Sequence, residues 1–233
     1  MSKPVCAVVG VGPGNGAACA RAFSREGYHV ALLARNLEYL ESLSQEIEDS
    51  RALQLDVTNL DNIEDVFRRI GAEMGPIGVL VYNAGSGSFK SIDDTAYEDM
   101  EAGWRINALG CFAAAKQVIP AMRESGSGSI IVIGATASLR GGAKAAPFAS
   151  AKAAQRSLVQ SMARHLGPDG IHVGYLIIDG MIDLERTRQA FPDRSQDAFI
   201  RPDDVAEAVL YLVRQPPSGW TFELDIRPSV ETW

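Results

Sequence analysis

Short runs of apolar, β-branched residues alternate along the chain with longer segments in which apolar residues recur at helical spacing. The apolar runs lie at Val5–Val9, Val30–Leu33, Ala52–Leu55, Val79–Val81, Ile130–Ile133 and Val173–Ile178. A further apolar run, Trp220–Ile226, is a candidate for one more strand. This alternation is typical of βαβ units, in which a parallel sheet is buried on both faces. The pattern therefore predicts an α/β fold with a doubly wound parallel sheet.

The segments between these runs have the spacing of amphipathic helices. They are Gly16–Glu26, Leu37–Glu48, Asn59–Met74, Tyr97–Arg123, Pro147–Leu166 and Asp203–Arg214. Helix start signals stand at Asn36, Asn59 and Pro202, where a capping residue or a proline opens the helical pattern. The polar segment Ile182–Ile200 is predicted to be an insertion over the carboxyl edge of the sheet, where open α/β sheets bind their ligands.

Length and composition favour a single globular domain. The 233 residues are 46% hydrophobic and 22% charged, which is ordinary for a folded protein. Neither a repeat nor a linker divides the chain, so we expect one domain that spans residues 1–233. No stretch approaches the roughly 18 apolar residues of a membrane-spanning helix.

Charge and cysteine content limit the partners and the compartment. The chain has 22 Lys and Arg residues against 29 Asp and Glu, a net charge of −7, which argues against nucleic acid and anionic membranes as partners. Cys6, Cys19 and Cys111 lie far apart in apolar surroundings and are predicted to be reduced core thiols of a cytoplasmic protein. The histidines lack metal-ligand spacing, so we expect no metal.

A glycine-rich loop follows the first predicted strand directly. It reads Gly10-Val11-Gly12-Pro13-Gly14-Asn15-Gly16 and runs into a helical segment. Glycines let the main chain approach a pyrophosphate, and the helix N-terminus supplies N–H groups and a positive dipole. The loop therefore predicts a nucleotide-diphosphate site at Gly10, Gly14, Asn15 and Gly16. A purely structural turn and the loop of an S-adenosylmethionine methyltransferase are alternatives, whereas the missing Gly-Lys-Ser/Thr ending argues against a P-loop hydrolase.

The end of the second predicted strand reads Leu33-Ala34-Arg35-Asn36. An acidic residue at this point would accept hydrogen bonds from the ribose hydroxyls of NAD(H), whereas an arginine can pair with a 2′-phosphate. Arg35 therefore favours NADP(H) over NAD(H) as the cofactor. The alternative is that Arg35 is a solvated charge at the end of a strand.

Several motifs, in order and at family spacing, make the chain resemble the short-chain dehydrogenase/reductase family from Val5 to about Asp225. The glycine loop matches the family's Gly-x-x-x-Gly-x-Gly motif, although Val9 stands where a threonine is usual. The resemblance assigns cofactor contacts to the end of the adenine-side strand and to the nicotinamide side of the site. The matching residues are Asp56 and Val57 of Leu55-Asp56-Val57, and Asn83, Ala84 and Gly85 of Tyr82-Asn83-Ala84-Gly85.

This resemblance also carries expectations about fold and assembly. It implies one Rossmann-like domain that binds NAD(P)(H), and it implies a homodimer or homotetramer. Tyr97, Trp104 and Phe112 of the long predicted helix are then expected in the core or at a subunit interface.

The catalytic positions depart from the family pattern. The family places a tyrosine four residues before a lysine on one helix, so that both share a face and the ammonium lowers the pKa of the phenol. In this chain these positions are Phe148 and Lys152, and the family's upstream serine is replaced by Ala135. Asn107 matches the family's asparagine on the long helix. The chain looks like a divergent subgroup with phenylalanine in place of the tyrosine, and the predicted catalytic set is Asn107, Lys152, Phe148 and Ala135.

The leading function is an NAD(P)(H)-dependent oxidoreductase with an atypical active site and a small carbonyl or hydroxyl compound as substrate. Without a phenol, Lys152 can donate the proton directly or through a water held by Asn107, and the hydroxyl of Thr136 or Ser138 can replace that of the missing serine.

Other interpretations stay open. Lys152 can instead serve only to hold the nicotinamide ribose, and a further hypothesis pairs it with Asp179 or Asp183 at the sheet edge. The protein can also be a catalytically silent NADP(H)-binding sensor or partner subunit, or a non-redox lyase or isomerase that reuses the cavity.

Overall fold

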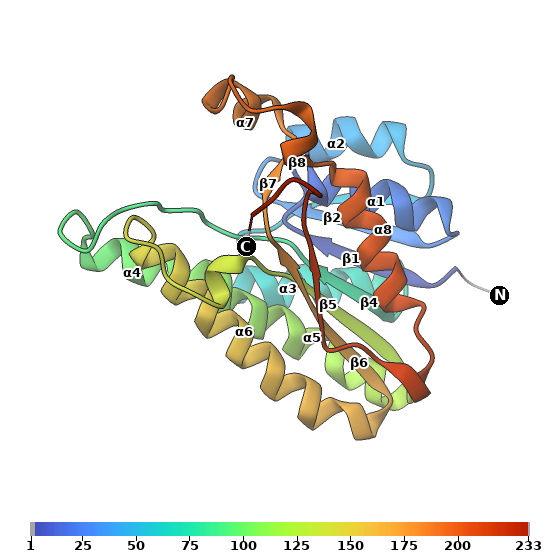
Figure 1. The fold of residues 1–233 in the computed structure, drawn as a ribbon. Helices are drawn as coiled ribbons and strands as arrows, with labels where there is room; N and C mark the ends of the chain where they lie inside the picture. Colours follow the sequence, from blue (N-terminus) through green and yellow to red (C-terminus); the bar gives the residue numbers. More distant parts are fainter. Residues whose placement is uncertain (1–2, 233) are drawn as a thin grey trace.

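A seven-stranded parallel sheet runs through the centre of the protein, whose computed structural model describes residues 3–232 (Figure 1). Its strand order is β3-β2-β1-β4-β5-β6-β9, and each neighbouring pair is parallel. The strands are β1 (Val5–Val9), β2 (His29–Ala34), β3 (Ser50–Gln54), β4 (Ile77–Tyr82), β5 (Gly128–Ile133), β6 (Ile171–Ile178) and β9 (Glu223–Ile226). The order reverses between β1 and β4, which is where doubly wound sheets bind ligands.

Helices cover both faces of this sheet (Figure 1). One face carries α1 (Asn15–Arg25), α2 (Leu37–Glu46) and α8 (Pro202–Val213). The other carries α3 (Leu60–Glu73), α5 (Gly110–Ser125) and α6 (Ala146–Leu166), with α4 (Tyr97–Trp104) packed against α6. The predicted fold, a single-domain, Rossmann-like, doubly wound parallel sheet, is confirmed.

Alternate residues of one strand belong to two different hydrophobic cores. Val5, Ala7 and Val9 of β1 face the core beneath α3, α5 and α6, whereas Cys6 and Val8 face the core beneath α1, α2 and α8. All five side chains are buried. This two-sided burial explains why the strands read as continuous apolar runs rather than as alternating patterns.

Three predicted helix starts are confirmed. The Asn36 side chain accepts a hydrogen bond from the main-chain N–H of Tyr39 at 3.1 Å. The Asn59 side chain accepts one from the main-chain N–H of Asn62, also at 3.1 Å. Pro202 is the first residue of α8, where its missing N–H would have no partner within the helix in any case.

The predicted helical segment Tyr97–Arg123 is helical throughout, but it is not α-helical throughout. A π-helical turn, Arg105–Leu109, separates α4 from α5. The Tyr82 hydroxyl and the Gln155 side-chain amide each donate a hydrogen bond to a main-chain carbonyl of this turn. Donors from outside the helix thus form hydrogen bonds to main-chain carbonyls of the turn. Single π-helical turns inside α-helices are frequent at functional sites.

The segment predicted as an insertion at the carboxyl edge contains small elements of its own. β7 (Met181–Ile182) and β8 (Phe199–Ile200) pair in parallel, and α7 (Glu185–Ala190) lies between them in sequence. Figure 1 shows this segment beyond the end of the sheet, with α7 projecting from the body of the protein. The hydrophobic pattern does not reveal these strands because two paired residues are too few to show a period.

Tyr97, Trp104 and Phe112 lie on the surface. Their exposed fractions are 92%, 47% and 43%, so a place in the core is excluded for all three. Their role at a subunit interface stays a prediction.

The burial of the cysteines agrees with the sequence analysis. Cys6, Cys19 and Cys111 are free and buried, as predicted for core thiols. Within residues 3–232, no helix is both long enough and apolar enough to cross a membrane.

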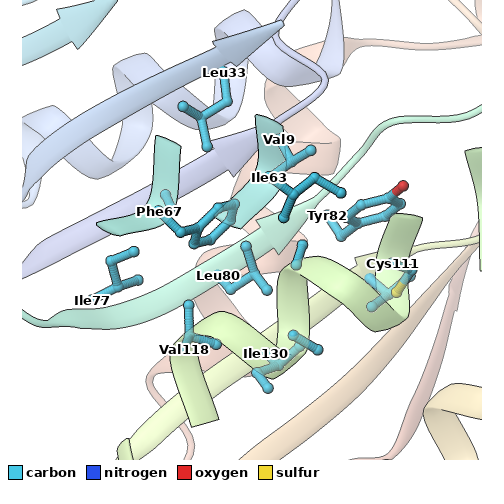
Figure 2. Close-up of a cluster of buried hydrophobic side chains, with 14 of the residues drawn as sticks. Val9, Leu33, Ile63, Phe67, Ile77, Leu80, Tyr82, Cys111, Val118 and Ile130 are labelled. Carbon is cyan, nitrogen blue, oxygen red and sulfur yellow. The ribbon is translucent and has the colours of Figure 1, made fainter. Parts of the chain in front are cut away.

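We expect the Leu80→Ala substitution to lower the free energy of unfolding by about 2–5 kcal/mol, because it leaves a cavity in a packed core. Leu80 of β4 is fully buried, and Figure 2 shows it among side chains such as Phe67 of α3 and Val118 of α5. Urea denaturation measures the loss. The control is Leu60→Ala, at a residue that is 47% exposed, and equal losses in the two variants would contradict the assigned core.

Candidate functional site

The glycine-rich loop joins β1 to α1 at the carboxyl edge of the sheet. Gly10 has a φ of +90°, and a Cβ atom on it would lie 2.4 Å from the main-chain nitrogen of Ala84. A Cβ atom on Gly16 would lie 2.6 Å from the carbonyl oxygen of Gly10. The Asn83 side chain donates a hydrogen bond to that same oxygen at 2.7 Å. The loops after β1 and β4 are thus held together with no room for side chains between them.

The start of α1 provides the predicted anion-binding turn. Asn15 is the first residue of this helix, and its Oδ1 atom is buried without a hydrogen-bond partner in the described part of the chain. The preceding residue, Gly14, faces Leu184: a Cβ atom on Gly14 would lie 2.8 Å from a methyl carbon of that side chain. Free N–H groups at a helix N-terminus attract anions. The turn therefore fits a pyrophosphate, and Leu184 borders the same space.

The predicted adenine-side residues lie at the ends of β2 and β3. Arg35 follows β2 and is exposed. Asp56 lies just beyond β3, and its carboxylate accepts hydrogen bonds from the main-chain N–H of Thr58 at 2.9 Å and from its hydroxyl at 2.8 Å. These bonds hold the pKa of the Asp56 carboxyl below its ordinary value, with a smaller contribution from the charge of Arg35. The neighbouring Val57 is half-buried.

Three predicted site residues from different elements meet at one point. A Cβ atom on Gly85 would lie 3.2 Å from Oδ1 of Asn107 and 3.6 Å from Nζ of Lys152. Asn107 is fully buried in the π-helical turn, and its Nδ2 donates to the Gly103 carbonyl at 2.9 Å. Its Oδ1 has no hydrogen-bond partner among residues 3–232. Glycine at position 85 therefore places no side chain next to these two polar atoms, which are themselves buried.

The Lys152 ammonium is buried, with 5% of the residue exposed. Its Nζ donates to the Ile133 carbonyl at 3.0 Å and to Oε1 of Gln155 at 2.9 Å. Burial disfavours the charged form and lowers the pKa of Lys152 to about 8. A lysine with such a pKa can release or take up a proton near neutral pH.

Phe148 and Ala135, which the sequence analysis matched to the tyrosine and the serine of the family pattern, carry no hydroxyl. Phe148 lies one turn before Lys152 on α6, and its ring packs against that of Phe89 with 5.1 Å between the ring centroids. Ala135 has an extended main chain just beyond β5. Neither side chain can donate a proton.

Of the two nearby hydroxyls, that of Thr136 is hydrogen-bonded, whereas Oγ of Ser138 is buried without a hydrogen-bond partner among residues 3–232. The Thr136 hydroxyl donates its proton toward Oδ1 of Asp179 at 2.6 Å and lies 3.2 Å from the Ile178 carbonyl. Ser138 is 6% exposed and lies beside the Tyr175 hydroxyl. The Thr136 proton is therefore directed at Asp179 rather than at a substrate.

The expected pairing of Asp179 or Asp183 with Lys152 is wrong. Asp179 pairs with Arg227 at 3.2 Å. Asp183 accepts a hydrogen bond from Arg188 at 2.8 Å, and this contact holds the pKa of the Asp183 carboxyl below its ordinary value. Each carboxylate thus has an arginine partner of its own.

Two buried residues beside Lys152 were not among the predicted site residues. Gln155 is fully buried and contacts Lys152 directly. The Tyr175 hydroxyl lies 3.5 Å from the Lys152 carbonyl and 3.5 Å from Oε1 of Gln155. A signal for Gln155 exists in the sequence, because residues three apart share a helix face. Tyr175 comes from β6, and no sequence spacing connects it to Lys152.

The sheet topology and the glycine loop define a Rossmann-like protein with a ligand site at the reversal of strand order. Residues 4–195 match the family of short chain dehydrogenases. The chain belongs to this family of oxidoreductases.

Relatives match along the whole chain. An uncharacterised oxidoreductase of Staphylococcus aureus (strain USA300) is 28% identical over 231 residues, which cover 98% of this chain and 98% of the relative. The crystal structure of a short-chain dehydrogenase from Rhodopseudomonas palustris has a TM-score of 0.84 at 36% identity and covers 97% of this chain and 98% of that one. The structure of an alcohol dehydrogenase from the archaeon Thermococcus sibiricus, complexed with 5-hydroxy-NADP, has a TM-score of 0.89 at 27% identity and covers 99% of each chain.

Alanine substitutions at two loop glycines are expected to separate binding from folding. In Gly14→Ala the new methyl meets only the flexible end of Leu184, so we expect a stable protein whose Kd for NADPH rises about tenfold or more, because the main chain no longer allows close approach. In Gly10→Ala a positive φ and the Ala84 main chain resist the methyl, so we expect a loss of about 1–3 kcal/mol in unfolding free energy. Nicotinamide fluorescence and urea denaturation measure the two effects. Wild-type affinity in a folded Gly14→Ala protein would argue against this turn as the cofactor site.

Proposed function

We propose that the protein is an NADP(H)-dependent oxidoreductase with an atypical active site that acts on a small carbonyl or hydroxyl compound. The observation that carries the proposal is the meeting of Lys152, Asn107 and Gly85 beside the glycine loop, at positions where the family resemblance assigns catalytic and nicotinamide-side roles. A bound nicotinamide dinucleotide would supply the hydride. The residues of the chain would then hold the substrate and move the proton.

The site fits a dinucleotide along its length. Gly10 and Gly16 make the tight turn, and Gly14 and Asn15 present the helix N-terminus to the pyrophosphate. At the ends of the site we assign the adenine-side contacts to Arg35, Asp56 and Val57, and the nicotinamide-side contacts to Asn83, Ala84, Gly85 and Lys152.

Arg35 supports NADP(H) over NAD(H). It is exposed at the end of β2, where a guanidinium can pair with a 2′-phosphate. The Thermococcus sibiricus alcohol dehydrogenase, a relative of similar fold, is complexed with 5-hydroxy-NADP. Both observations favour the phosphorylated cofactor.

We expect Arg35→Ala to raise the Kd for NADPH about tenfold, because a charge-assisted pair with the 2′-phosphate is lost. The Kd for NADH, which lacks that phosphate, should change much less. Fluorescence titration with both dinucleotides measures the difference. Arg164→Ala, at another exposed arginine, is the control, and equal loss of NADH and NADPH affinity in Arg35→Ala would contradict the assigned pairing.

Lys152 is the candidate proton donor. Reduction of a carbonyl leaves an alkoxide that needs a proton, and neither Phe148 nor Ala135 has one to give. The ammonium and Asn107 Oδ1 both lie within 3.6 Å of the position of a Cβ atom on Gly85, so donation can be direct or through a water held by Asn107. In this role the active form of Lys152 is the protonated one.

The reduction rate of the wild-type protein is therefore expected to fall as pH rises through about 8, since the ammonium loses its proton above that pH. Lys152→Met should lower kcat by about 10²-fold or more and remove this pH dependence. NADPH consumption over a panel of small carbonyl compounds, recorded at several pH values, measures both effects. An unchanged pH profile in Lys152→Met would eliminate Lys152 as the donor.

We also propose that the chain represents a subgroup in which phenylalanine replaces the catalytic tyrosine of the family. If the missing hydroxyls limit the rate, the double variant Phe148→Tyr with Ala135→Ser should raise kcat/KM for carbonyl reduction about 10²-fold or more. Phe148→Leu with Ala135→Ser is the matched control and should show no such gain. A double variant no faster than wild type would contradict this account of the two positions.

The lack of both hydroxyls also favours a second function, a catalytically silent NADP(H)-binding protein. Absorbance at the nicotinamide band distinguishes the two, because an oxidoreductase changes it during turnover and a sensor, a partner subunit, a lyase or an isomerase does not.

For assembly, the exposed Tyr97, Trp104 and Phe112 support a homodimer or homotetramer.

A further inference from the structure

A buried amide lies between the site lysine and the π-helical turn. Gln155 of α6 is 0% exposed. Its Oε1 accepts a hydrogen bond from Nζ of Lys152 at 2.9 Å, and its Nε2 donates to the main-chain carbonyl of Asn107 at 2.9 Å. We call these two hydrogen bonds the amide bridge.

The chemistry of the neighbours fixes the orientation of this amide. An ammonium can only donate, so the atom of Gln155 that faces Lys152 must be the oxygen. The carbonyl of Asn107 can only accept, so the atom that faces it must be the nitrogen. A reversed amide would lose both hydrogen bonds in a buried place, where unsatisfied polar groups are costly.

The Tyr175 hydroxyl lies close to the same oxygen and equally close to the Lys152 carbonyl. The distance to Oε1 of Gln155 is 3.5 Å, and burial raises the pKa of Tyr175 to about 12, so the phenol keeps its proton. The ring of Tyr175 also fills the space beside Gly134, where a Cβ atom would lie 2.3 Å from the ring. The bridge is therefore part of a packed polar cluster beneath the end of β5.

The amide bridge determines where the last proton of Lys152 points. An ammonium has three N–H groups. Two of them are taken by the Ile133 carbonyl and by Gln155, and the ammonium lies 3.6 Å from the position of a Cβ atom on Gly85. With two donors fixed on these two oxygens, the third is left for the side of Gly85, an exposed residue.

The geometry points to Gln155 as a positioning residue that acts through Lys152. It holds the ammonium and the π-helical turn of Asn107 in one fixed arrangement and aims the remaining N–H at the site. Its effect on the charge of Lys152 follows from the contacts alone, whereas its effect on turnover rests on the proposed function.

Two substitutions at Gln155 should move the pKa of Lys152 in opposite directions. Gln155→Leu removes the acceptor of the charged form, so the pKa of Lys152 should fall by about one unit or more. Gln155→Glu places a carboxylate beside the ammonium, so the pKa of Lys152 should rise. A residue needed only for packing would not produce shifts of opposite sign.

The test records the titration of lysine side chains by NMR on protein with ¹³C-labelled lysine, in the absence of any cofactor. The Lys152→Met variant identifies the Lys152 signal. Gln160→Leu, a partly exposed glutamine on the same helix, is the matched control and should leave that signal unchanged. Glutamate has nearly the shape of glutamine, so the pKa of Lys152 in Gln155→Glu tests the proposal even if Gln155→Leu does not fold. A Lys152 pKa that stays at the wild-type value in the folded Gln155 variants would overturn the proposal.

Activity adds a readout that depends on the proposed function. In Gln155→Leu we expect kcat for carbonyl reduction to fall about tenfold or more, because a hydrogen bond to a charged group is lost, and its decline with pH to begin at a lower pH. In Gln155→Glu the decline should begin at a higher pH. If wild-type protein neither binds NADPH nor turns over, the proposed function fails while the NMR titration still decides the role of Gln155.

Discussion

The close approach of the loops after β1 and β4 is the constraint on which the site depends. At Gly10 the main chain comes so near to Ala84 that no side chain could stand between them, and the Asn83 side chain ties the two loops through the Gly10 carbonyl. These strands are neighbours in the sheet and meet where the strand order reverses. The contact therefore sets the distance between the start of α1, which can receive an anion, and Gly85, which borders the lysine. A dinucleotide would need the start of α1 and Gly85 at a fixed separation. A contact between main chains fixes that separation, because main-chain atoms have little freedom to move apart.

The second constraint is a buried cation that is held by neutral oxygens. Lys152 bonds one carbonyl and one amide oxygen, and the carboxylates of Asp179 and Asp183 pair with arginines instead. A carboxylate beside the ammonium would stabilise its charge and raise its pKa. Neutral acceptors orient the ammonium and stabilise its charge less than a carboxylate would, so burial still holds the pKa of Lys152 at about 8. The neutral oxygens that position Lys152 thus also allow it to exchange a proton near neutral pH.

The sequence predicts the fold well because the inner strands are buried on both faces and two helices begin at asparagine caps. Continuous apolar runs located the seven strands of the main sheet, and asparagine caps located two helix starts. The sequence predicted a helix over Arg105–Leu109 but not its π-helical form, since the hydrogen-bond donors to this turn come from Tyr82 and Gln155, which lie far away in sequence. The hypothesis about the partner of Lys152 was wrong for a related reason. Charge and sheet-edge location suggested Asp179 or Asp183, whereas the observed partner is a neutral residue one turn along its own helix.

The polar groups around α6 suggest how the chemistry of the site is distributed. On the side of Phe89, the helix presents the apolar ring of Phe148, so a substrate there meets a surface that cannot donate a proton. Deeper along the same helix, Gln155 and Lys152 form hydrogen bonds in a place closed to water. Hydrogen bonds in such surroundings are stronger than in water and allow fewer alternative arrangements. An ammonium with two N–H groups held by the Ile133 carbonyl and Gln155 has one direction left for its third N–H, and a fixed direction matters most when no second acid stands beside it. Under the proposed function, the absence of both hydroxyls on one side of α6 and the ordered amide on the other would be two parts of one arrangement, in which proton donation depends on the orientation of a single lysine.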